Sequence, residues 1–347
     1  MFLYLKPIGN PEMPFIDDIL TYKSLSIVGL EKNTGKTECL NYVLSRLKDM
    51  DKRIALTSIG IDGESRDIVT NTHKPEIRIY NGMIFISAEK HYLQRRITSE
   101  ILDVSNIHTS LGRLVTARAL SSDKVMLSGP PDTHTLKSLI AGMSQYNVDL
   151  TIVDGALSRL SLASPAVTEG MVLATGAAYS ANIPELVRKT KYVIDLINLP
   201  EVEPALKQQL DAVESGILAI DPQGCLHDLN VQSVFMLEKA KDRIFSHGNK
   251  LFVAGATSNN LFEFLRMQKN AASIELIVKD FTKIFASPDV YYSFIRKGGT
   301  VKVVTRTKLA AVCINPVSPQ GYRLSSDELK AAMQDALQMP VYDVKKL

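Results

Sequence analysis

Residues 29–37 combine the side chains and the spacing that bind phosphate groups. The segment reads Gly-Leu-Glu-Lys-Asn-Thr-Gly-Lys-Thr and lies between the apolar run 25–28 and a helix-like stretch, residues 38–48. Where a glycine-bounded turn joins a strand to a helix, backbone N–H groups and the helix N-terminus face an anion. Lys36 would supply a positive charge, and the Thr37 hydroxyl would supply a ligand for Mg²⁺. The segment therefore predicts a nucleoside-triphosphate site, with ATP as the default nucleotide.

The spacing of this loop is one residue longer than usual. Four residues commonly separate the first glycine from Gly-Lys-Thr, whereas residues 30–34 make five here. The longer loop resembles that of dethiobiotin synthetase, and residues 32–37 resemble the loop of the molybdopterin-guanine dinucleotide accessory proteins. These resemblances imply a P-loop NTPase core. The residues expected to bind the nucleotide are Gly29, Lys32, Asn33, Thr34, Gly35, Lys36 and Thr37.

A magnesium nucleotide also needs an acidic partner at the end of a neighbouring strand. Asp154 follows the apolar run 150–153 and precedes a glycine, which resembles the acid-glycine pair of the dethiobiotin synthetase relatives. Asp62 follows the second apolar run, where relatives place another acid near the metal. The alternatives are that Asp154 caps a helix and that Asp62 is an ordinary turn residue. We expect Thr37, Asp62 and Asp154 to be the magnesium ligands.

Two basic residues are further candidates for phosphate contacts. Lys32 is similar to a lysine that reaches the partner's phosphates in some dimeric ATPases, although those enzymes place it five residues before the invariant lysine and here the spacing is four. A homodimer is therefore one open assembly, and a solvated Lys32 is the alternative. Arg159 is expected to reach the γ-phosphate or a substrate, with a surface ion pair as the alternative. The catalytic candidates are Lys36, Asp154 and Arg159.

Composition limits the class of protein. The chain has 347 residues, 45% hydrophobic and 22% charged, with a net charge of +3, which indicates a globular protein and gives no indication of nucleic-acid binding. No apolar run reaches the length of a membrane span. Three cysteines, Cys39, Cys225 and Cys313, are far apart and are expected to be small apolar residues in a reducing cytoplasm.

Short apolar runs alternate with helical segments along the chain. This pattern predicts an α/β fold with a doubly wound, mostly parallel sheet. We expect an N-terminal arm (1–22), a nucleotide-binding domain (23–200) and an α/β C-terminal subdomain or sheet extension (201–347). Local expectations are a βαβ unit with adjacent parallel strands at 25–57, a hairpin at 77–86, helices at 89–102, 110–120 and 135–145, and buried strands at 150–153, 171–174, 192–196, 217–220, 251–254, 274–278, 301–304 and 310–314. Ser128-Gly129, Thr175-Gly176 and residues 315–319 follow strands and are weaker candidates for ligand contacts, the last beside the base. The alternative is that they are ordinary turns, with a structural Pro-rich turn at 315–319.

Two classes of function fit these features. One is an ATP-dependent small-molecule ligase or synthetase of the dethiobiotin synthetase type. The other is an accessory factor in which hydrolysis changes protein contacts. Residues 24–38, 57–64 and 152–159 resemble the small subunit of the lysine 5,6-aminomutase reactivase of lysine degradation. That resemblance implies a cytoplasmic ATPase that works with a MutS-like ATPase subunit to reactivate a cobalamin-dependent aminomutase, and it favours the second class.

Overall fold

The computed structural model describes residues 13–59, 77–156, 164, 167–231 and 244–347. The chain divides into two compact units, one made of Met1–Thr190 with Lys308–Leu347 and the other of Lys191–Thr307. The C-terminal segment thus returns to the unit in which the chain begins. The sequence left open whether the C-terminal part extends the first sheet or forms its own. In the structure residues 308–347 contribute strands to the first sheet, and the unit 191–307 has a sheet of its own.

The first unit contains a mixed, mostly parallel sheet. Within the described residues this sheet has nine strands in the order β18-β17-β9-β1-β8-β2-β4-β6-β5. The strands from β18 to β4 in that order are parallel, and β6 and β5 are antiparallel to their neighbours. The strands are β1 (Ser24–Gly29), β2 (Ile54–Ser58), β4 (Ile84–Ala88), β5 (Ser99–Thr109), β6 (Gly112–Ala119), β8 (Leu150–Ala156), β9 (Gly170–Gly176), β17 (Lys308–Asn315) and β18 (Val341–Tyr342). The other elements are α1 (Ile16–Ile19), α2 (Lys36–Leu47), the short pair β3 (Ile77–Ile79) and β7 (Asp123–Val125), α3 (Glu89–Leu93), α4 (Thr133–Gly142), η1 (Met143–Tyr146), α5 (Ile183–Ile197), which ends in the second unit, and α10 (Ser326–Leu337).

Strand β1 lies near the middle of this sheet and is covered on both faces. All six of its residues are buried, which is typical of parallel strands with helices on both faces. Helix α2 places Leu40, Val43, Leu44 and Leu47 in the same core. Their spacing of three and four residues makes one apolar stripe, and each fully buried side chain stabilises the fold by roughly 1.5–3 kcal/mol.

The order of strands corrects one expectation. The sequence predicted that β1 and β2 are adjacent, but β8 lies between them and pairs in parallel with both. Sequential strands are neighbours only about two-thirds of the time. The insertion matters for the site because it places the carboxyl end of β8 directly beside the loop that follows β1.

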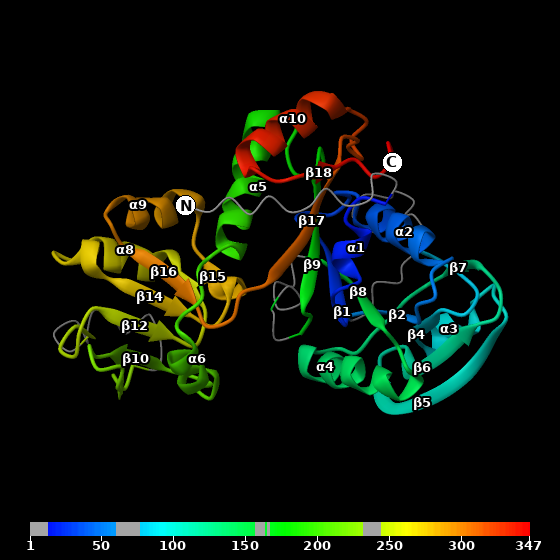
Figure 1. Cartoon of the computed structure of the whole chain (residues 1–347), viewed down its shortest axis with the longest axis horizontal. Coiled ribbons are helices and arrows are strands. Elements are labelled where there is room, and N and C mark those ends of the chain that lie inside the picture. The colour runs from blue at the N-terminus through cyan, green and yellow to red at the C-terminus, as the bar shows by residue number, and fades with distance from the viewer. Residues whose placement is uncertain (1–12, 60–76, 157–163, 165–166, 232–243) are drawn as a thin grey trace. The chain divides into compact units, whose positions relative to one another are not determined.

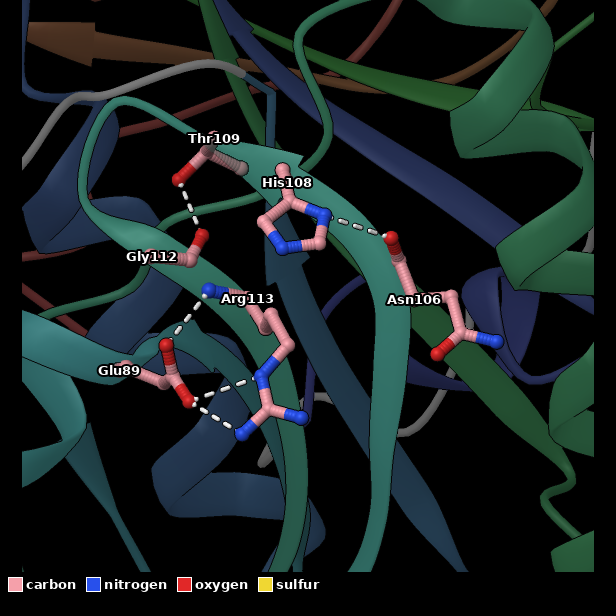
Figure 2. A network of polar contacts seen from close by, with 6 residues as sticks. All are labelled: Glu89, Asn106, His108, Thr109, Gly112 and Arg113. Carbon is pink, nitrogen blue, oxygen red and sulfur yellow. Dashed lines mark hydrogen bonds and ion pairs between the residues drawn. The ribbon is translucent and has the colours of Figure 1, made fainter.

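The predicted helices at 89–102 and 110–120 are wrong. Only Glu89–Leu93 is helical, and the long antiparallel ribbon of β5 and β6 follows, drawn in cyan at the edge of the sheet in Figure 1. Figure 2 shows how α3 is attached to the tip of this ribbon: the Glu89 carboxylate accepts hydrogen bonds from the backbone N–H and guanidinium of Arg113. These bonds lower the pKa of Glu89 below its usual value. Near the turn, the Thr109 hydroxyl donates to the carbonyl of Gly112 at 2.8 Å.

The predicted hairpin at 77–86 is also wrong, although its turn is present. Gly82 has a φ of 86°, and Met83 N–H donates to the Tyr80 carbonyl at 3.1 Å. The strands on either side separate: β3 pairs with β7, whereas β4 pairs with β2 and β6. A turn signal therefore specified the local bend and not the partner strands.

The second unit has its own sheet. Within the described residues it has five strands in the order β11-β10-β12-β14-β16, of which β12, β14 and β16 are parallel. Its elements are α6 (Pro204–Asp211), β10 (Ile217–Ile220), β11 (Leu226–Asp228), β12 (Lys250–Val253), β13 (Thr257–Ser258), α8 (Asn259–Arg266), η4 (Ala271–Ser273), β14 (Glu275–Val278), η5 (Phe281–Lys283), β15 (Ile284–Phe285), α9 (Pro288–Arg296) and β16 (Thr300–Val303). Helices α8 and α9 lie next to each other (Figure 1) and bury the edge-to-face pair Phe262 and Phe294.

The expected strands at 217–220, 251–254, 274–278 and 301–304 are confirmed in this unit. The expected strand at 192–196 is wrong, because these residues belong to α5. Among the helices that the structure describes, none is long and apolar enough to span a bilayer.

Candidate functional site

The loop after β1 exposes backbone donors at the start of α2. Two of its residues are left-handed, Asn33 with a φ of 62° and Gly35 with a φ of 91°. Left-handed residues turn successive N–H groups toward one side, and helix N-termini leave several N–H groups without partners. Within the described residues, no acceptor lies in hydrogen-bond geometry to the N–H groups of Gly35, Lys36 and Thr37. This arrangement is able to bind an anion.

The extra residue of the loop is accommodated by a closed turn. The Thr34 hydroxyl donates to the Glu31 carbonyl at 2.8 Å, and the Thr34 side chain is almost fully buried. It lies directly over Gly29, where an added Cβ would be 2.7 Å from Thr34 Oγ1. A glycine is therefore required at 29, because any side chain there would displace Thr34 and open the turn.

Lys36 and Asp154 form an ion pair at the base of this loop. The Lys36 ammonium lies 2.9 Å from Asp154 Oδ1, and the two side chains are 18% and 8% exposed. The ammonium is near this oxygen but not in the direction of a hydrogen bond, so Oδ1 is buried without a hydrogen-bond donor among the described residues. Buried carboxylate oxygens normally accept hydrogen bonds, and one that accepts none is available to a cation or to the water molecules bound to it.

Strand pairing positions Asp154. It lies within β8, opposite Ile27 of β1 and Ser58 of β2. The Ser58 hydroxyl donates to the Asp154 carbonyl at 3.2 Å. Two residues earlier, on the same face of the sheet, the corresponding row holds the core residues Leu25, Ile152 and Leu56. The acid therefore takes the place of a core residue at the carboxyl end of the sheet, where open α/β sheets bind ligands. Asp154 lies inside strand β8, which continues to Ala156.

The other expected nucleotide contacts lie in different environments. Thr37 is half-buried in the first turn of α2, close in sequence to Lys36. Lys32 is exposed at the tip of the loop, and its backbone N–H donates to the carboxylate of Glu31 at 2.9 Å. Asp62 and Arg159 lie outside the described residues. Among the described residues, no three His, Cys, Asp or Glu side chains converge as a metal site, so a cation here would depend on Thr37, Asp154, water and the phosphates.

The weaker candidates at other strand ends are engaged in packing. An added Cβ on Gly129 would lie 1.5 Å from the Ser58 carbonyl oxygen, so the chain at 129 covers the end of β2. Thr175 is buried, and its hydroxyl lies 2.9 Å from that of Thr190. Asn315, by contrast, reaches the loop, and its amide nitrogen donates to the Asn33 carbonyl at 3.2 Å.

Sequence reasoning missed a buried polar cluster beside β4. Ser128 Oγ accepts a hydrogen bond from the Ala88 N–H at 2.8 Å and lies 3.1 Å from His91 Nδ1 and 3.3 Å from Ser87 Oγ. Burial lowers the pKa of His91 from its usual value of 6.5. A single histidine in a polar segment carried no spacing signal that would have identified it.

Two of the three cysteines are brought together. Cys39 of α2 and Cys313 of β17 are buried with their sulfur atoms 3.4 Å apart. Contact with Cys39 and burial raise the pKa of the Cys313 thiol well above its usual value. The expectation that the cysteines act as small apolar residues filling space in the core is confirmed for this pair and is wrong for Cys225, which is exposed.

Comparison of the chain with family models, with curated proteins and with solved structures finds no match. We therefore infer its function from the geometry of this chain and from the resemblances of its short motifs.

Proposed function

We propose that this chain is a P-loop NTPase that binds a magnesium-nucleoside triphosphate, ATP by default, at residues 29–37. The observation that carries the proposal is the ion pair between Lys36, the first residue of α2, and Asp154 of β8, 2.9 Å apart. It lies at the base of a loop whose N–H groups at Gly35, Lys36 and Thr37 have no acceptor among the described residues. A cation, backbone N–H donors and a carboxylate are the groups that a magnesium polyphosphate requires. Supporting features are the left-handed residues Asn33 and Gly35.

Each residue has a separate task in this proposal. The amides of the loop and the Lys36 ammonium hold the phosphate oxygens and stabilise the charge that develops on them during transfer to water. Thr37 and Asp154 would hold Mg²⁺, Asp154 through its buried Oδ1 or a bound water. When bound, the cation neutralises phosphate charge and draws electron density from the bond that breaks. Asp62 and Arg159 stay candidates for the metal and for the γ-phosphate.

Turnover tests this assignment. We expect slow magnesium-dependent release of phosphate from ATP, with Asp154→Asn lowering the rate by about 100-fold because one of the charged groups at the reacting phosphate is lost. Glu201→Gln is a matched control, because it removes a carboxylate that also pairs with a lysine, at 3.2 Å, in the other unit. Equal rates in Asp154→Asn and the wild type would refute the role of this acid.

We propose further that hydrolysis serves an accessory, reactivating role in the cytoplasm. The basis is the resemblance of residues 24–38 to the reactivase small subunit, and the specific expectation is a cobalamin-dependent lysine 5,6-aminomutase with a MutS-like ATPase as partner. Phosphate release should then rise when the partner ATPase and inactivated aminomutase are added together. Turnover that instead requires a small carboxylic or amino substrate, with no protein added, would favour a ligase or synthetase and contradict the accessory role.

A further inference from the structure

The phosphate loop needs an external support. Asn33 and Gly35 are both left-handed, a conformation that costs a non-glycine residue of order 1 kcal/mol unless its surroundings maintain it. Within the loop, the Thr34 hydroxyl bond to Glu31 closes only the first part of the turn. The carbonyl of Asn33 lies beyond that turn, and its partner comes from a residue 282 positions later, Asn315.

Asn315 is held firmly enough to act as that support. It is the last residue of β17, its Oδ1 accepts the Val317 N–H at 3.1 Å, and its carbonyl accepts the Ala177 N–H at 2.8 Å. Two glycines make room for it. An added Cβ on Gly35 would be 2.7 Å from Asn315 Cβ, and one on Gly176 would be 2.1 Å from the Asn315 carbonyl oxygen.

We infer that Asn315 is a positioning residue for the phosphate loop: its amide holds the Asn33 carbonyl away from the anion and thereby keeps the N–H groups of 35–37 converging on the phosphates. This inference depends on the proposed function. It differs from the sequence expectation that residues 315–319 border the base, because a support of the loop acts on the phosphates whatever base is attached.

Two substitutions separate these roles. Asn315→Ala removes the donor, whereas Asn315→Asp keeps the acceptor for Val317 and replaces the donor with a second, negatively charged oxygen facing the Asn33 carbonyl. Binding is measured by calorimetry with magnesium-ATP, magnesium-GTP and magnesium-tripolyphosphate, which has no base. Asn249→Ala, which removes an amide bonded to Ser273 at 2.8 Å in the other unit, is the control, and thermal unfolding confirms that each variant is folded at the temperature of the titration.

We expect Asn315→Ala to weaken all three ligands by a similar factor of about 10, the effect of one lost hydrogen bond, and Asn315→Asp to weaken them by about 100-fold because of the added charge. Asn249→Ala should change none of them. A loss confined to ATP or GTP, with tripolyphosphate unaffected, would assign Asn315 to the base and overturn the inference. Unchanged affinities would also overturn it. If the wild type binds none of the three ligands, the proposed function fails and this inference fails with it.

Discussion

Neutralising Lys36 should destabilise the nucleotide-free protein more than neutralising Asp154 does. Lys36→Met keeps most of the side-chain volume but leaves the Asp154 carboxylate, 8% exposed, without its cation. Asp154→Asn leaves an ammonium that is 18% exposed and can turn toward water. Removing one partner of a buried pair is costly because the remaining charge is uncompensated.

The separation of the two groups sets the magnitude. At 2.9 Å, the direct attraction is about 6 kcal/mol for an effective dielectric constant of about 20, and desolvation of two largely buried groups offsets much of it. We therefore expect a coupling energy of about 1–3 kcal/mol in a double-mutant cycle. The expected losses of unfolding free energy are about 2–3 kcal/mol for Lys36→Met and about 1 kcal/mol for Asp154→Asn.

The assay is denaturant unfolding of the wild type, the two single variants and the double variant, in buffer without nucleotide. The pair Lys207 and Glu201 of the other unit is the control, since its atoms are 3.2 Å apart but its side chains are 33% and 43% exposed. Exposed pairs of this kind couple by less than about 1 kcal/mol. A Lys36–Asp154 coupling no larger than that of the control would refute the reasoning that the pair is buried and charged.

Three further predictions concern packing and protonation. Gly129→Ala should destabilise the protein by more than about 3 kcal/mol in denaturant unfolding, because its Cβ would lie 1.5 Å from the Ser58 carbonyl oxygen. The control Gly142→Ala, with nothing within 4 Å of its Cβ, should change stability by less than about 1 kcal/mol. Equal effects of the two substitutions would contradict the close approach of residue 129 to Ser58. Tyr192→Phe should lower the free energy of unfolding by about 1–2 kcal/mol, because the Tyr192 hydroxyl donates to the buried Ala286 carbonyl at 2.6 Å and this acceptor would lose its donor. An unchanged unfolding midpoint would show that the hydrogen bond contributes nothing. The pKa of His91 is lowered in the folded protein, so the unfolded chain binds more protons, and stability should fall as the pH drops below about 6.5. His91→Gln should reduce this dependence in denaturant unfolding at several pH values. The dependence would be absent if the imidazole were already charged in the folded protein.

Local patterns in the sequence located most strands, because parallel strands buried on both faces appear as short continuous apolar runs. The run before the loop became β1 and the run 217–220 became β10. The same signal failed at 192–196, since a short apolar run has no period that separates a strand from one turn of a buried helix. Tertiary context decided that case in favour of α5.

The sequence of the β5–β6 ribbon predicts helices for a different reason. Its pairing register shifts between Ile101 and Asp103 and again between Val104 and His108. The first shift inserts one extra residue into β5 and the second inserts two, so the alternation of two that identifies a strand is interrupted. The half-exposed, polar character of β5 removed the remaining signal.

The candidate site was only partly predictable, because the loop is local and its surroundings are not. Gly29 and Lys36 follow from the motif, and the acid at 154 follows from its position at the end of an apolar run. The neighbouring position of β8, the contact of Asn315 with Asn33 across 282 residues and the meeting of Cys39 with Cys313 arise from pairing between distant segments. One sequence contains no information on such pairs beyond what each segment shows by itself.

The most direct test of the account is calorimetric titration of the wild type and Lys36→Met with a non-hydrolysable ATP analogue, with and without Mg²⁺. We expect a single magnesium-dependent site in the wild type and an affinity at least about 100-fold weaker in Lys36→Met, which loses a charge-assisted contact with the phosphates. Binding of equal strength in both proteins, or no binding in the wild type, would contradict the central claim that residues 29–37 hold a nucleoside triphosphate.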